Sequence, residues 1–250
     1  MNFSELAEEA PEDDESFDQE TFDSGVEKRV SVIMLLDTSK SMAFDDAPQP
    51  TPIDQLNHEL SSWAQDVRAD TRLRHRAEIA IITFGSGGVI IHQLGEDGPF
   101  VPAARFHPPT LSASGVTPML KAITSAIDVS MKRKETLDKE HIRRFRPLIF
   151  MLSDGAPTDD SGNVLEADSI TAVAREIAAL EAEKHLAFFA VGVLGADVAK
   201  LKLLAPESYW DLGVGDFSEF LRLMSTSAGK ADPLSHAREE IARLLGKSKT

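Results

Sequence analysis

VSVIMLL, residues 30–36, is an almost continuous apolar run that ends at Asp37. A run of this length suits a strand buried on both faces, as in a parallel sheet covered by helices. Similar runs occur at residues 77–84, 148–152 and 187–193. These four segments predict the centre of one α/β sheet.

Segments with helical spacing of apolar residues alternate with these strands. Thr51-Pro52 starts the first, with Pro at a position that favours helix entry. Residues 89–91 follow 77–84 after a glycine-rich turn and predict a hairpin, and 209–212 predicts a last strand. The expected fold is α/β: a doubly wound, mostly parallel six-stranded sheet with one antiparallel edge strand and helices on both faces.

The charge of the chain is concentrated at its beginning. The chain has 250 residues, 41 acidic and 26 basic, for a formal net charge of −15. Residues 1–24 contain ten carboxylates and no Lys or Arg, so the remainder has 31 acidic and 26 basic residues. We therefore expect an acidic, disordered tail over 1–27, a domain over 28–228, and a C-terminal tail over 229–250 with a short helix.

Composition also excludes several classes of protein. Without cysteine there is no disulfide framework, zinc–thiolate site, iron–sulfur cluster or cysteine nucleophile. The acidic balance argues against non-specific binding to nucleic acid or anionic lipid. No apolar run approaches the ~20 residues of a membrane helix, and the acidic N-terminus is unlike a signal peptide. We expect a cytoplasmic protein.

Small oxygen-bearing side chains gather in three loops. Two of these loops directly follow buried strands, and the third opens a helix. In an open α/β sheet, loops at the carboxyl ends of the strands converge on one crevice. Two carboxylates and three hydroxyls there make an all-oxygen site suited to Mg²⁺ or Mn²⁺, with a coordination position left for a partner's carboxylate. The candidate metal ligands are Asp37, Ser39, Ser41, Thr117 and Asp154.

The order of these five residues resembles the metal-ion-dependent adhesion site (MIDAS) of von Willebrand factor A (VWA) domains. DTSKSM, ITFG and RPLIFMLSDGAPTD further resemble the bacterial cytoplasmic TerY-like, tellurium-resistance branch. The resemblance implies that Ser39, Ser41 and Thr117 ligate the metal directly. It implies that Asp37 and Asp154 act through waters or by orienting the hydroxyls.

Two features depart from that family's pattern. Lys40 stands where relatives usually have glycine, which places a cation near the site. The insertion over 43–50 lengthens the loop before the first helix. We expect its Asp45 and Asp46 either to rim the site or to occupy the open coordination position.

The expected function is a metal-dependent protein–protein interaction module without enzymatic activity. By the resemblance, its partners are a kinase, phosphatase or AAA+ ATPase of a stress-response or conflict system. The alternatives are a metal-dependent phosphohydrolase using the same site and a regulatory subunit of an AAA+ machine. Against catalysis, no general base stands out, and neither a P-loop nor a G-x-S-x-G motif is present.

A basic stretch over 132–146 is expected on the face opposite the metal site. We weigh two interpretations, a solvated loop and a docking site for an acidic segment such as the N-terminal arm. The seven histidines show no H-x-x-x-H pair and are interpreted as ordinary surface or core residues.

Overall fold

The computed structural model describes residues 27–43, 50–85, 87–193, 196–213 and 217–247. One sheet forms its centre, with strands in the order β3-β2-β1-β5-β6-β7 and β4 paired with the same strand as β3. The strands are β1 (Val30–Thr38), β2 (Ala77–Gly85), β3 (Gly88–Ile91), β4 (Val101–Pro102), β5 (Leu148–Ser153), β6 (Ala187–Val193) and β7 (Tyr209–Gly213).

The predicted fold class is confirmed. β1 pairs in parallel with β2 and β5, and the parallel order continues through β6 to β7. β3 is the predicted antiparallel strand at the edge of the sheet. The structure adds the two-residue strand β4, which also pairs antiparallel with β2 and comes from a Pro-rich loop without strand periodicity.

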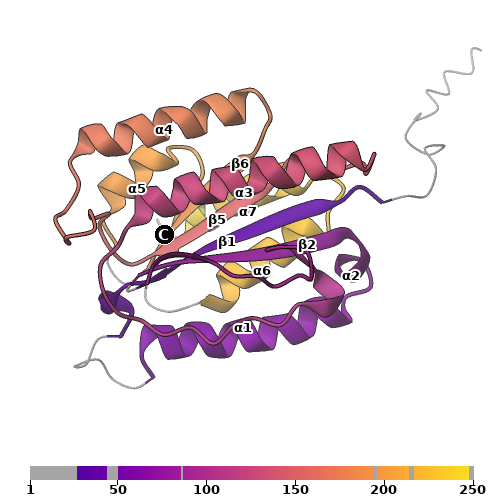
Figure 1. Ribbon diagram of the computed structural model, residues 1–250, viewed down its shortest axis with the longest axis horizontal. Helices are drawn as coiled ribbons and strands as arrows, with labels where there is room; N and C mark the ends of the chain where they lie inside the picture. The colour runs from indigo at the N-terminus through magenta and orange to yellow at the C-terminus, as the bar shows by residue number, and fades with distance from the viewer. Residues whose placement is uncertain (1–26, 44–49, 86, 194–195, 214–216, 248–250) are drawn as a thin grey trace, which may run out of the picture.

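Helices cover both faces of the sheet (Figure 1). One face carries α1, α6 and α7, which pack on Val32, Met34 and Leu36 of β1. The other carries α3, α4 and α5, which share a core with Ile33 and Leu35. The helices are α1 (Pro52–Ala69), α2 (Leu73–Arg76), α3 (Met119–Lys139), α4 (Ala167–Ala182), α5 (Val198–Leu204), α6 (Phe217–Ala228) and α7 (Pro233–Lys247), with 3₁₀ turns η1 (Lys40–Ala43) and η2 (Ala103–Arg105).

Local sequence explains how α1 begins. The Thr51 side chain accepts from the backbone N–H of Asp54, whose carboxylate accepts from the Thr51 N–H. This capping box satisfies backbone donors that a helix start leaves unpaired. It fixes the direction in which the chain leaves the loop that follows η1.

The segment expected as a C-terminal tail with a short helix, residues 229–250, contains the helix α7, which packs on the domain. α7 has 15 residues, and Ala237, Ile241 and Leu244 are buried in the same cluster as α6 and the sheet. An apolar residue every three to four positions gives the helix one face to bury. These residues are therefore part of the main core.

Some expectations fall on residues outside the described ranges. They are the acidic tail up to residue 26 and the loop over 44–49 with Asp45 and Asp46. Within the described ranges, no helix combines the length and apolarity needed to cross a membrane.

The topology creates a switch point at one end of the sheet, and we call this position the crevice. After β1 the chain moves to β2 on one side, and it later returns to β5 on the other side of β1. The connections therefore diverge at the carboxyl ends of β1 and β5, where open α/β sheets bind ligands. In Figure 1 this end lies on the left, beside η1 and the start of α1.

Candidate functional site

Asp37, near the carboxyl end of β1, is the most deeply buried acid of the site. It is 0% exposed. Its Oδ1 accepts from the backbone N–H of Ser39 at 2.8 Å, and its Oδ2 accepts from the Ser153 hydroxyl of β5 at 2.6 Å. Because both oxygens have donors, the carboxylate is held in one orientation between two adjacent strands.

Hydroxyl groups connect the first loop to the third. Ser39 Oγ lies 3.0 Å from Ser41 Oγ, which in turn donates to Asp154 Oδ1 at 2.8 Å. The second carboxylate oxygen of Asp154 is buried and has no hydrogen-bond partner. Buried polar atoms almost always have a partner, and an exception calls for an explanation such as a bound ion.

Thr117 enters from the loop before α3. Its backbone N–H donates to Thr158 Oγ1 at 2.9 Å, and the Thr158 N–H donates back to the Thr117 carbonyl at 2.9 Å. The Thr117 side chain lies beside Gly155. A Cβ added there would be 3.5 Å from Thr117 Oγ1 and 3.9 Å from Ser41 Oγ. Both hydroxyls therefore border the same glycine, next to Asp154.

Backbone hydrogen bonds tie the first two loops together. The Lys40 N–H donates to the Gly115 carbonyl at 3.0 Å, and the Ser114 N–H donates to the Thr38 carbonyl at 2.9 Å. All five predicted ligands thus lie together at the carboxyl ends of β1 and β5. That they bind a metal stays a prediction.

Two residues that hydrogen-bond to the predicted ligands were not themselves among those ligands. Ser153 directly precedes Asp154, and its place at the end of a buried strand was a usable signal. Thr158 carried no such signal, because its role depends on a fold of the loop that brings it back to Thr117.

Burial raises the cost of ionising both carboxylates, and the charge of Asp154 adds to the cost at Asp37. Burial, followed by the charge of Asp154, raises the pKa of Asp37 from 3.8 to about 7, while hydrogen bonds from Ser153 and Ser39 oppose the shift. Burial likewise raises the pKa of Asp154, and the Ser41 hydroxyl opposes it. A cation between the carboxylates would remove this repulsion.

The residues present fit a hard divalent cation. The donors are carboxylate and hydroxyl oxygens, which Mg²⁺ and Mn²⁺ prefer. The buried Asp154 Oδ2 has no hydrogen-bond partner, so this oxygen is available to coordinate a cation. In the described part of the chain, no three His, Cys, Asp or Glu residues group in a way that would hold a metal, so this site depends on two carboxylates supplemented by hydroxyls.

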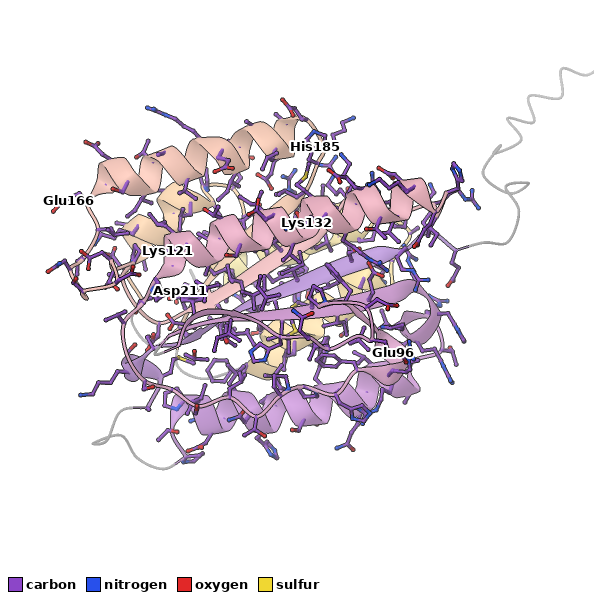
Figure 2. All side chains as sticks on the ribbon, in the orientation of Figure 1. Glu96, Lys121, Lys132, Glu166, His185 and Asp211 are labelled. Carbon is purple, nitrogen blue, oxygen red and sulfur yellow. The ribbon has the colours of Figure 1, made fainter. Side chains whose placement is uncertain are left out.

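Charged groups surround the crevice. Lys40 is exposed beside the site, and Lys121 forms an ion pair with Asp160. Figure 2 shows Lys121 and Asp211 toward this end of the sheet and His185 toward the other. Of these groups, the exposed ammonium of Lys40 is the cation that an incoming acidic group would meet without a carboxylate paired to it among the ion pairs of the described residues.

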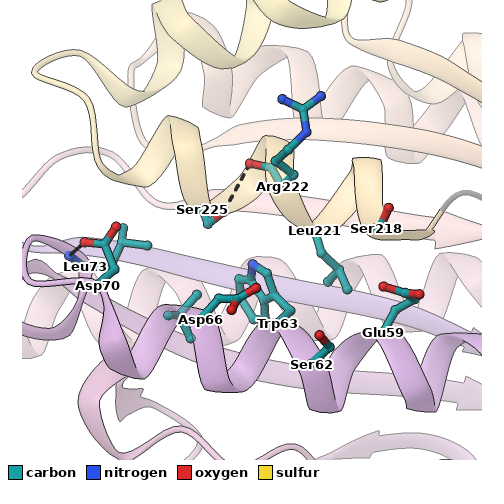
Figure 3. Close-up of a pocket in the computed structure, with 11 residues that line it drawn as sticks. Glu59, Ser62, Trp63, Asp66, Asp70, Leu73, Ser218, Leu221, Arg222 and Ser225 are labelled. Atoms are coloured by element: carbon teal, nitrogen blue, oxygen red, sulfur yellow. Dashed lines mark hydrogen bonds between the residues drawn. The ribbon is translucent and has the colours of Figure 1, made fainter.

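Other hollows lie away from the strand ends. A groove of about 260 Å³ separates α1 from α6 and contains Glu59, Trp63 and Asp66 (Figure 3). A larger hollow of about 550 Å³ lies between α3 and the loop that leads to β4, beside Phe100 and Arg133. Neither contains any of the five predicted ligands.

Comparisons with known protein families and with curated protein sequences find no match. Several solved structures are similar to the structure of this chain. The vWF domain of the type V pili tip protein Mfa5 from Porphyromonas gingivalis is 11% identical with a TM-score of 0.54, over 81% of this chain and 95% of that one. The pilus adhesin SpaC from Lactobacillus rhamnosus GG is 14% identical with a TM-score of 0.58, over 81% of this chain.

This chain spans about a third of the SpaC structure, with 31% of it covered. At these identities the likeness establishes the fold alone. The chain has a VWA-like fold, as predicted. The MIDAS assignment and the TerY-like branch stay predictions.

Proposed function

We propose that the protein is a divalent-metal-dependent interaction module, in which Mg²⁺ or Mn²⁺ at the crevice accepts a carboxylate from a partner protein. The observation that carries this proposal is the buried pair Asp37 and Asp154, bridged by Ser39 and Ser41, with one carboxylate oxygen unpartnered. A VWA-like fold, which the similar pilus proteins share, supports an interaction role over a catalytic one.

The residues divide into two groups. Ser39, Ser41 and Thr117 would hold the ion through neutral hydroxyls, and Asp37 and Asp154 would supply the charge and orient those hydroxyls. When bound, the cation provides an electrophilic position for an outside oxygen. Neutral donors withdraw little of its charge, so an anionic ligand is favoured.

The partner proposed here is a protein with an exposed Glu or Asp. The exposed ammonium of Lys40 would attract such a side chain toward the crevice. We also propose a cytoplasmic stress-response or conflict setting with a kinase, phosphatase or AAA+ ATPase as partner. That setting rests on the sequence resemblance, whereas the similar structures come from pilus proteins.

The test is calorimetric titration of the EDTA-stripped full chain with Mg²⁺ and with Mn²⁺. We expect saturable binding at one site. Ser39→Ala removes one hydroxyl donor and is expected to weaken binding at least tenfold, a loss of about 1.4 kcal/mol.

Ser130→Ala is the matched control, because Ser130 is a buried serine of α3 that donates to the Ile127 carbonyl. It should bind the ion like the unaltered chain. If the titration gives no binding heat, it is repeated with millimolar acetate, whose carboxylate stands in for that of the partner. Failure with acetate present contradicts the proposal, as does equal binding by Ser39→Ala. Turnover of a phosphate ester that requires Asp37 would favour the phosphohydrolase instead.

A further inference from the structure

The end of the sheet opposite the crevice is strongly basic. The amino ends of β1, β2 and β5 meet here, with α2 beside them (Figure 1). Each strand is preceded by Arg or Lys, and the turn between α6 and α7 adds another cation. We call this surface the basic end, defined by Lys28, Arg29, Arg72, Arg76, Arg146 and Lys230.

Contacts hold several of these residues close together. The Arg29 N–H donates to the Arg143 carbonyl at 2.8 Å, and the Phe145 N–H donates to the Arg29 carbonyl at 2.9 Å. Lys28 and Arg76 both lie over the Phe145 ring, at 5.5 and 4.7 Å from its centre. Stacking on a ring positions these cations but neutralises neither of them.

Backbone contacts extend the surface to the turn after α6. The Arg76 guanidinium donates to the Lys230 carbonyl, and Arg72 and Lys230 line one hollow of about 240 Å³ together with Asp70. Among the described residues, none of the six cations forms an ion pair within 4 Å, although Glu27 lies near Arg76 and Asp232 near Arg146. The nearby Arg144 differs, because Asp138 pairs with it through both oxygens at 2.8 Å.

The acidic segment of the chain is attached at this surface. Residues 1–24 contain ten carboxylates and no Lys or Arg, and the described chain begins at Glu27, next to Lys28 and Arg29. A tether of 26 residues spans at most about 90 Å when fully extended, so the whole basic end is within its reach. Such a short tether gives an effective concentration of order millimolar, so even a weak charge attraction fills the surface.

We propose that the acidic arm, residues 1–26, docks on the basic end of its own domain. Charge complementarity selects this surface over the crevice, where Asp37 and Asp154 contribute negative charge. A docked arm screens the basic end, so a partner with an acidic surface has to displace it. Docking of the arm on the basic end requires no bound metal.

The test is paramagnetic relaxation enhancement in the full chain. The chain has no cysteine, so Ser16→Cys gives one thiol for a nitroxide label within the arm. At low salt we expect the label to reduce the amide signals of Arg72, Phe145 and Lys230 at least about twofold. In about 0.5 M NaCl the signals should return, because screening shortens the Debye length to about 4 Å.

Two variants of the labelled chain separate charge attraction from chance proximity. Arg72→Glu with Lys230→Glu reverses two exposed cations of the basic end and should abolish the effect. The control, Lys132→Glu with Lys202→Glu, makes the same charge change on α3 and α5 and should retain it. Figure 2 labels Lys132 on α3.

Three results would overturn the inference. They are signal loss centred on the crevice, no loss at the basic end at low salt, or equal loss in both charge variants. Mixing labelled chains with isotopically enriched, unlabelled chains gives the last check. Signal loss that persists in the mixture assigns the arm to a second copy and contradicts docking on its own domain.

Discussion

Asp37→Asn is expected to stabilise the metal-free protein while abolishing metal binding. The carboxyl is 0% exposed, and its pKa is raised from 3.8 to about 7, first by burial and then by the charge of Asp154. Because the pKa of Asp37 is higher in the folded state than in the unfolded state, the protonated form of this carboxyl favours folding. That contribution is fully present below pH 3.8 and is lost as the pH rises to about 7.

The magnitude follows from the size of the shift. About three pKa units at 1.36 kcal/mol each give an ionisation cost of about 4 kcal/mol above pH 7. An amide has no such cost and can still accept from the Ser39 N–H. Its NH₂ faces Ser153 Oγ, so that hydrogen bond reverses direction, at a cost of about 1 kcal/mol. We therefore expect a gain of about 2–3 kcal/mol at pH 8.

The assay is urea denaturation in EDTA at pH 8 and at pH 5. At pH 5 most of the ionisation cost is already relieved, so the difference between Asp37→Asn and the unaltered chain should shrink by about 2 kcal/mol. Comparing the two proteins at each pH cancels the titration of their other carboxylates. The reasoning would be refuted if the variant were less stable than the unaltered chain at pH 8. It would also be refuted if the difference in free energy of unfolding between the two proteins were the same at both pH values.

Three further predictions use other features of the structure. Because a metal has to displace the proton of Asp37, its affinity should fall up to about tenfold per pH unit below 7; a constant Kd between pH 5.5 and 7 contradicts this. Glu78→Gln leaves the half-buried Arg133 without its carboxylate and should cost about 3 kcal/mol in urea denaturation; a cost below about 1 kcal/mol shows a dispensable ion pair. Ile241→Ala should cost about 2–4 kcal/mol, because Ile241 is 1% exposed in the core; no loss of stability would place α7 outside the cooperative domain.

The sheet was predictable because its central strands are buried on both faces. VSVIMLL needs no periodicity to be recognised, and β1 is buried along all nine of its residues. Elements without such a signal were missed. β4 has two residues and α2 has four, so neither is long enough to show a repeat, and packing fixes both.

The positions of the site residues were predictable for a related reason. Asp37 lies one residue before the end of β1, and Asp154 directly follows β5. These two strands pair in parallel, which brings their carboxyl ends together. The raised pKa of Asp37 was not predictable, because it depends on burial and on Asp154, which is distant in sequence. The same holds for Thr158, whose hydrogen bond to Thr117 spans 41 residues.

The most direct measurement of the central claim is anomalous diffraction from crystals of the protein grown with Mn²⁺. The account predicts one peak at the carboxyl ends of β1 and β5, about 2 Å from the hydroxyl oxygens of Ser39, Ser41 and Thr117. A crevice without a peak at saturating Mn²⁺, or a peak elsewhere in the molecule, would contradict it.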